Sequence, residues 1–184
     1  MLAAAGVPHE AQAAGVDEEA AKAALAADGL DARQLADALA ELKAIRLSAR
    51  RPGDVVLGCD STVAAPDGTL LDKPADRAEA AAHLRLLRGG THRLVSAIVA
   101  AEAGRPVWRH VETAKLTMRS FSDAFLDAYL DAEWPAIAGC VGCYRLEGPG
   151  VQLFSRIEGS HFTILGLPLL PLLDWLRSRG AMLA

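Results

Sequence analysis

The 184-residue sequence contains few cysteines, few aromatic residues and no excess of positive charge. Three cysteines, an odd number, are too few for a disulfide framework and are typical of a reducing compartment, so the sequence predicts a cytoplasmic location. The net charge of −4 argues against the broad positive field that proteins use to bind nucleic acid. An anionic ligand would therefore need local lysine or arginine side chains.

The sequence also lacks an apolar stretch long enough to cross a bilayer. Its longest apolar run, from Phe162 to Leu173, is interrupted by Gly166, Pro168 and Pro171, whereas a transmembrane helix needs about 20 apolar residues. No basic segment followed by an apolar one opens the chain. The sequence therefore predicts neither a signal peptide nor a membrane partner.

Hydrophobic residues make up 52% of the chain and charged residues 23%, as in ordinary globular proteins. At this length we expect a single domain over residues 1–184, large enough to bury a hydrophobic core. There are no repeats, low-complexity segments or linkers that would divide it.

Capping residues and apolar periodicity predict helices interleaved with strands. Helices are expected after the capping residues Asp17, Asp31, Asp76 and Ser122. Apolar runs predict strands at residues 54–59, 94–101, 107–118, 151–157 and 162–165. This mixture of long-range strands, hairpins and helices predicts an α/β fold, with a twisted mixed β-sheet flanked by helices.

The segment around Asp60 is the most informative part of the chain. An apolar run at 55–57 brings Asp60 to the predicted end of a buried strand, and a Pro-Asp-Gly turn at 66–68 folds the chain back toward Lys73. Carboxylates that bind a divalent metal, beside a lysine that neutralises phosphate, are what hydrolysis of a phosphate anhydride requires. A β-hairpin with solvated surface charges is the alternative, and these residues alone leave both interpretations open.

The same segment resembles a known family. Gly-Cys-Asp-Ser-Thr-Val at 58–63 and Asp-Lys-Pro at 72–74 resemble the G-[AC]-D-[ST]-x-V and L-[GD]-K-P signatures of the Maf family of nucleoside triphosphate pyrophosphatases. Further blocks follow in the family's order at 6–8, 16–18, 39–44, 87–92, 147–150, 157–159 and 166–169. The resemblance covers nearly the whole chain and implies a Maf/ITPase-like fold.

The resemblance implies a hydrolase of nucleotide metabolism that converts a nucleoside triphosphate, modified or non-canonical ones included, to the monophosphate and pyrophosphate. It implies that Asp60 is the catalytic base and a metal ligand, and that Glu18 is a second ligand of Mg²⁺ or Mn²⁺. It also implies phosphate contacts for Lys43 and Lys73 and a place beside the nucleotide for Ser61. Without the resemblance, Glu18 would be explained as a first-turn helix acid and Lys43 as a residue of a helix surface.

The base preference stays open at this point. Glu147 stands where the branch of the family that acts on dTTP and UTP usually has glutamine, and it resembles the branch that acts on 7-methyl-GTP. A glutamate can accept hydrogen bonds from base N–H groups, which favours a guanine edge or a cationic methylated base over thymine. That branch, however, often has glutamine directly after the aspartate, where this chain has Ser61.

The chain departs from the family at its start. Members open with a strand and a Ser-x-x-Arg-Arg loop that helps hold the triphosphate, whereas residues 1–6 resemble the end of the first helix. We expect one of three explanations: a chain cut short, a misplaced start codon, or a catalytically impaired nucleotide-binding or regulatory protein. The last of these is suggested by the link between members of the family and arrest of septum formation. Retention of Glu18, Lys43, Asp60 and Lys73 favours the enzyme. A missing opening strand would leave a sheet edge unpaired, which is compatible with a homodimer.

Two other features have simpler interpretations. Cys140 and Cys143 form a C-x-x-C motif, but no second cysteine pair or paired histidines complete a zinc site, so a structural role is predicted. His92 begins a predicted strand after a glycine pair, and a structural role is expected there as well.

Overall fold

The computed structural model describes residues 1–27 and 29–183. It divides into two compact units. Unit 1 comprises Met1–Ser61, Ser96–Glu112 and Ser160–Ala184, and unit 2 comprises Thr62–Val95 and Thr113–Gly159. The single domain expected over 1–184 stays a prediction.

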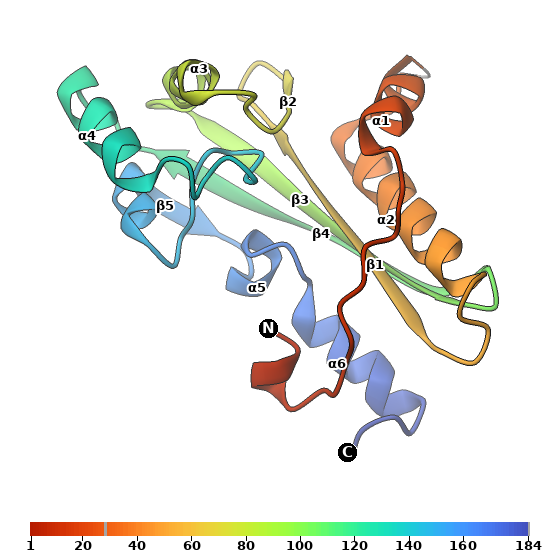
Figure 1. Ribbon diagram of the computed structural model, residues 1–184. Helices are drawn as coiled ribbons and strands as arrows, with labels where there is room; N and C mark the ends of the chain where they lie inside the picture. Colours follow the sequence, from red (N-terminus) through yellow and green to blue (C-terminus); the bar gives the residue numbers. More distant parts are fainter. Residues whose placement is uncertain (28, 184) are drawn as a thin grey trace. The chain divides into compact units, whose positions relative to one another are not determined.

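A five-stranded sheet runs in the order β2-β1-β3-β4-β5 (Figure 1). The strands are β1 (Val56–Ala64), β2 (Leu70–Leu71), β3 (Thr91–Glu102), β4 (Arg105–Met118) and β5 (Phe154–Glu158). The pairs β1–β2 and β4–β5 are antiparallel, and the arrows of β1, β3 and β4 alternate in direction in Figure 1. The prediction of a mixed sheet is therefore wrong. The strands β3 and β4 are antiparallel because they form a hairpin. The connection after β2 brings the chain back, so β3 runs in the direction opposite to β1.

The helices are α1 (Glu18–Ala27), α2 (Ala32–Ser48), α3 (Arg77–Leu87), α4 (Asp123–Glu133), α5 (His161–Ile164) and α6 (Leu169–Ser178), with short 3₁₀ turns η1 (Ala3–Ala5) and η2 (Pro149–Leu153). Helices α1 to α4 each begin after a side chain that caps them. All four predicted capping residues accept a backbone hydrogen bond, and Asp31 forms a complete capping box with Gln34. The strand predicted at 162–165 is wrong, because that segment forms the short helix α5. Within the described residues, no helix is long and apolar enough to span a membrane.

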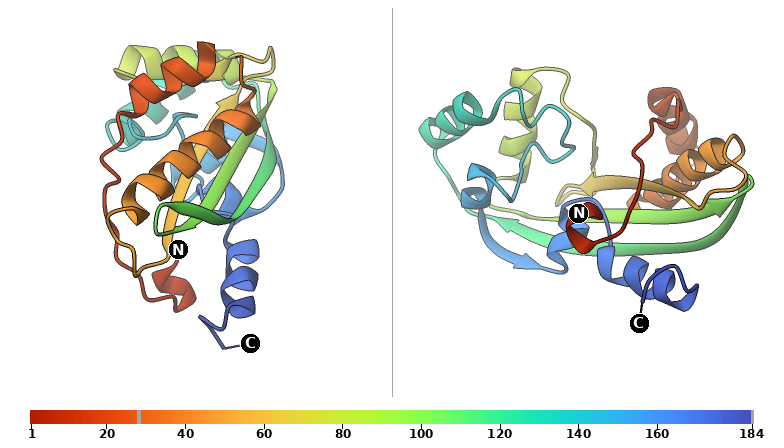
Figure 2. Two further views of the ribbon diagram at one scale, coloured as in Figure 1. Left: turned by 90° about the vertical axis from the view of Figure 1, so that its right-hand side faces the viewer. Right: turned by 60° about the horizontal axis from the view of Figure 1, so that its bottom comes forward.

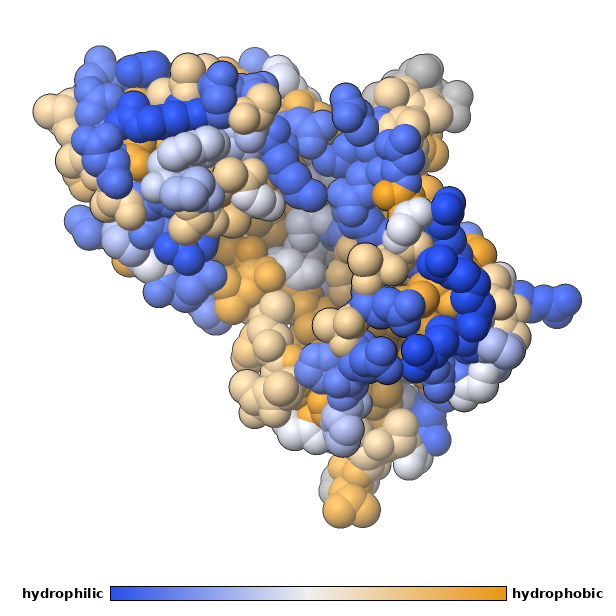
Figure 3. All heavy atoms as spheres, in the orientation of Figure 1, coloured by the Kyte–Doolittle hydropathy of each residue, from blue (hydrophilic) through white to orange (hydrophobic). Residues whose placement is uncertain are grey.

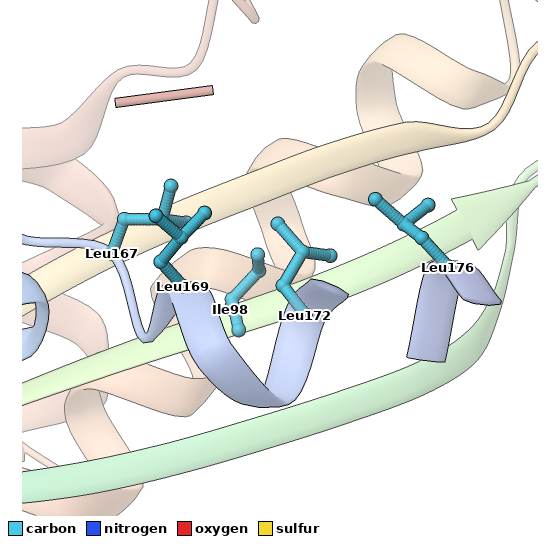
Figure 4. Packing of buried hydrophobic residues seen from close by; sticks show 5 residues of the cluster. All are labelled: Ile98, Leu167, Leu169, Leu172 and Leu176. Atoms are coloured by element: carbon cyan, nitrogen blue, oxygen red, sulfur yellow. The ribbon is translucent and has the colours of Figure 1, made fainter. Parts of the chain in front are cut away.

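Unit 1 has helices on both faces of its strands (Figure 2). On one side, α6 packs its leucines onto Ile98 of β3, and these side chains point toward one another in Figure 4. On the other side, α2 lies against β1, with α1 beside it. Hydrophilic residues gather next to α1 on the face drawn in Figure 3, so polar groups remain accessible there.

Unit 2 contains a buried aromatic cluster around His92. The His92 Nε2 lies 2.9 Å from the Tyr144 hydroxyl oxygen, and the ring also lies near Phe154. His92 is fully buried, and its Nδ1 has no hydrogen-bond partner among the described residues. Because burial disfavours the imidazolium charge, it lowers the pKa of His92 to about 4. The expected structural role fits this environment.

We expect the stability of the protein to fall as the pH decreases from neutrality toward 4, in part because of His92. The ordinary histidine pKa is 6.5 and the folded value is about 4. Between these values the unfolded chain binds more protons, so the stability due to neutral His92 is complete above 6.5 and is lost as the pH falls through 4. The loss should reach up to roughly 3 kcal/mol. Urea denaturation at pH 7 and 4.5 should show a smaller pH effect in His92→Gln than in the wild type. The exposed His9→Gln control should follow the wild type, and an unchanged pH effect in His92→Gln would contradict the assignment.

Candidate active site

The site is built on an unusually close approach of β1 to α2. A Cβ atom placed on Gly58 would lie 2.2 Å from the Ala40 carbonyl oxygen and 2.6 Å from the Ala44 backbone nitrogen. Ala40 and Ala44 are themselves fully buried. The missing side chain at 58 and the small ones on α2 therefore let the two backbones touch. Asp60 follows two residues later, on the same face of the strand.

Three predicted site residues converge at this contact. Lys43 of α2 donates hydrogen bonds from Nζ to Asp60 Oδ1 at 2.7 Å and to Glu18 Oε1 at 2.8 Å. Glu18 is the first residue of α1, and α1 packs against α2. The Asp60 side chain is only 8% exposed, whereas that of Glu18 is 38% exposed. The arrangement is thus a largely buried carboxylate linked through one ammonium group to a more accessible carboxylate.

Burial and ion pairing shift the pKa values of Asp60 and Lys43 in opposite directions. Burial raises the pKa of Asp60 above its ordinary value, although the hydrogen bond from Lys43 acts in the opposite direction. For Lys43, burial alone would lower the pKa, but the hydrogen bonds to Asp60 and Glu18 outweigh it and leave the pKa raised. Lys43 therefore carries its positive charge at neutral pH, and a carboxyl group with a raised pKa is suited to accept a proton.

The two carboxylates fit a divalent cation. The second oxygen of Asp60, Oδ2, is buried and has no hydrogen-bond partner among the described residues, which leaves it available to a metal ion or a water molecule. In that part of the chain no group of three or more His, Cys, Asp or Glu side chains is arranged to hold a metal. Mg²⁺ commonly binds through one or two carboxylates and completes its shell with water and substrate phosphates. Asp60 and Glu18 suit that kind of site.

Two sequence expectations about β1 need correction or stay open. Asp60 does not lie at the end of the strand, because β1 continues to Ala64 through Thr62 and Val63, two β-branched residues that favour extended structure. Ser61 faces away from Asp60: its Oγ lies 2.7 Å from Ser96 Oγ, which in turn donates to the Thr163 carbonyl oxygen. Since the one hydroxyl proton of Ser96 is used there, Ser61 is the donor in their bond. The predicted contact of Ser61 with a nucleotide stays a prediction.

Lys73 and Glu147 belong to unit 2. Lys73 is exposed just after β2, and its backbone N–H donates to Asp72 Oδ1 at 2.9 Å. Glu147 is exposed in a loop that is anchored nearby, because the Arg145 guanidinium donates two hydrogen bonds to the buried Glu133 carboxylate. Their roles toward phosphate and base stay predictions.

Sequence reasoning missed two contributors to the site. Lys22 adds a positive charge that lowers the pKa of Asp60 through space. Its position four residues after Glu18 on α1 was the available signal, since such residues share one face of a helix. Gly58 was seen only as part of a motif, and its contact with α2 has no signal in a single sequence.

The C-x-x-C motif forms a tight turn in unit 2. The Cys143 N–H donates to the Cys140 carbonyl oxygen at 2.9 Å, and Cys143 Sγ lies 3.6 Å from His83 Nδ1. Both cysteines are free thiols, and burial raises the pKa of Cys143 to about 12. A protonated thiol is a poor nucleophile and a poor metal ligand, so this geometry favours the predicted structural role.

Comparisons with known proteins agree with the motif resemblance. A family model described as Maf-like protein matches residues 1–179. A protein of Sphingopyxis alaskensis named nucleoside triphosphate pyrophosphatase is 53% identical over 180 residues, which cover 98% of this chain and 91% of that protein. Proteins of the same name from Caulobacter vibrioides and Paramagnetospirillum magneticum are 54% and 52% identical over 178 and 182 residues. These alignments cover 97% and 99% of this chain, and 88% and 93% of those proteins.

Proposed function

Because this chain belongs to the Maf family, we propose that it is a nucleoside triphosphate pyrophosphatase, like the relatives that carry this name. It hydrolyses the anhydride between the α- and β-phosphates and releases a nucleoside monophosphate and pyrophosphate. The observation that carries this proposal is the convergence of Glu18, Lys43 and Asp60, with one ammonium nitrogen within 2.8 Å of both carboxylates.

In this reaction, water attacks the α-phosphorus while the bond to the pyrophosphate leaving group breaks. Asp60 takes the proton of the attacking water, and its unpartnered Oδ2 is the atom available for this. Glu18 and Asp60 would hold Mg²⁺ or Mn²⁺, which when bound polarises phosphoryl oxygens and acidifies water. Lys43 and Lys73 offset negative charge on the triphosphate and on the leaving pyrophosphate.

Finer features belong to the same proposal. Modified nucleotides are the expected substrates, and Glu147 is expected to accept base N–H groups, which leans toward a guanine or methylated base. A cytoplasmic location and compatibility with a homodimer remain predictions from the sequence.

The identity of the first product tests the proposed reaction. Purified protein incubated with Mg²⁺ and a panel of nucleoside triphosphates should release monophosphate and pyrophosphate in equal amounts, and removal of the metal by a chelator should stop the release. Orthophosphate should be detected only after inorganic pyrophosphatase is added. Orthophosphate and a nucleoside diphosphate as first products would refute cleavage at the α-phosphorus.

A further inference from the structure

Lys43 is held in place by two carboxylates within unit 1. Its ammonium donates to Asp60 Oδ1 at 2.7 Å and to Glu18 Oε1 at 2.8 Å, and its side chain is only 18% exposed. Both carboxylate oxygens therefore converge on one positively charged atom. A divalent cation held by the same two oxygens, at about 2.0–2.1 Å from each for Mg²⁺, would need the space between them that this ammonium now fills.

We propose that Lys43 is an internal counter-ion that occupies the cation position between Asp60 and Glu18 in the nucleotide-free protein and leaves when a divalent cation enters. The identity of the cation as Mg²⁺ or Mn²⁺ rests on the proposed function. What is new is the competition: the lysine and the metal ion exclude each other from the same pair of oxygens.

The charge balance supports this role. A carboxylate as buried as Asp60, with 8% of its side chain exposed, is costly to keep ionised without an opposite charge in contact. Lys43 supplies that charge in the absence of metal. If the ammonium stayed beside the two carboxylates after a divalent cation had bound there, the two positive charges would lie within a few ångströms of each other. Their repulsion makes that arrangement unfavourable.

The structure also indicates which part can move. The α2 backbone cannot retreat from β1 without losing the contact of Ala40 and Ala44 with Gly58. The lysine side chain, with four rotatable carbons, can swing its ammonium away while its Cα stays in place. Asp60 Oδ2 is buried and has no hydrogen-bond partner among the described residues, so it offers a second carboxylate oxygen to a cation once this movement admits one.

Displacement of Lys43 has a consequence for the order of binding. In the metal-free protein, both carboxylates hold the ammonium, so it is poorly placed to bind a phosphate group. Once released, it becomes available to the negatively charged triphosphate. Cation and nucleotide should therefore bind with positive coupling, each favouring the swung-out position of Lys43.

Mn²⁺ titration of the nucleotide-free protein tests the competition. Free Mn²⁺ is measured by electron paramagnetic resonance for the wild type, Lys43→Met, Lys43→Arg and Lys115→Met. Lys43→Met should bind Mn²⁺ about tenfold more tightly than the wild type, which corresponds to ~1.4 kcal/mol. Lys43→Arg keeps the charge and should stay near the wild type. The exposed Lys115→Met, which removes the same charge elsewhere, should also stay near it.

Equal or weaker Mn²⁺ binding by folded Lys43→Met would overturn the proposal, as would a wild type that binds no Mn²⁺ at millimolar concentration. Circular dichroism establishes whether the variant is folded. If it is not, ¹⁵N NMR of the lysine ammonium groups in the wild type gives the answer: Mg²⁺ should shift the Lys43 signal selectively, and an unshifted signal at saturating Mg²⁺ refutes displacement. Neither measurement uses turnover. Loss of pyrophosphate release with the metal competition intact would contradict only the proposed function.

Discussion

Asp60→Asn should lower kcat by about 100-fold or more while the protein remains folded. The substitution keeps the size of the side chain and its capacity to accept a hydrogen bond from Lys43. It removes the group that takes the proton and one of the two negative charges that would hold the cation. Asp60 is also the most buried of the three converging side chains, at 8% exposed against 18% for Lys43 and 38% for Glu18.

Pyrophosphate release and Mn²⁺ affinity should both be measured on this variant, because both roles are assigned to Asp60. The exposed Asp174→Asn on α6 is the matched control and should behave as the wild type. An Asp60→Asn protein with unaltered turnover and unaltered Mn²⁺ affinity would remove Asp60 from the mechanism. Normal turnover with weakened Mn²⁺ binding would leave Asp60 as a ligand but not as the base.

Gly58→Ala should destabilise the protein by about 3 kcal/mol or more, at the upper end of the effect of overpacking. The added methyl group would lie 2.2 Å from the Ala40 carbonyl oxygen and 2.6 Å from the Ala44 nitrogen. These are backbone atoms in the middle of α2, so no side-chain rotation relieves the clash. The helix must move away from β1, and the distance between Lys43 and Asp60 must increase with it.

Thermal denaturation measures the effect, which should lower Tm by roughly 6–12 °C for a protein of this size. Gly53→Ala is the matched control, since its Cβ would meet nothing within 4 Å. We expect its Tm to lie within about a degree of the wild type. A Gly58→Ala protein as stable as the wild type would mean that β1 and α2 are not in backbone contact.

The identity of the converging residues could be predicted from the sequence, but the direction of the side chains in this segment could not. The motif around Asp60 and its family resemblance predicted Glu18, Lys43 and Asp60 as site residues, and the structure brings their side chains together. The same motif gave no information on the direction of each side chain. Ser61 was expected beside the nucleotide, yet it hydrogen-bonds to Ser96 on the other face of β1. Neighbouring residues of a motif share a sequence signal even when the pleat of the strand points them apart.

Caps were the most reliable local signal of the fold, because each depends on one side chain and the three residues that follow it. All four predicted caps are confirmed. The short apolar stretch at 162–165 was predicted as a strand and is the helix α5. A run of this length does not distinguish a buried strand from one buried helical turn. The prediction of strand direction failed for a different reason. Strand direction depends on how distant segments pair, and helices between strands do not by themselves require parallel pairing.

Side chains along β1 point alternately to its two faces, so the site depends on which residues of the strand face α2. Gly58 and Asp60 face α2, whereas Leu57 and Cys59 pack toward the α6 cluster of leucines. Insertion or deletion of one residue before Asp60 within β1 would present a thiol or a hydroxyl to Lys43 and bury the carboxylate among leucines. A change of two residues would restore the facing but shift Asp60 by about one pleat repeat, ~6.6 Å along the strand. Length variation is therefore compatible with this chemistry in the turn at 49–55 and incompatible with it between Val56 and Asp60.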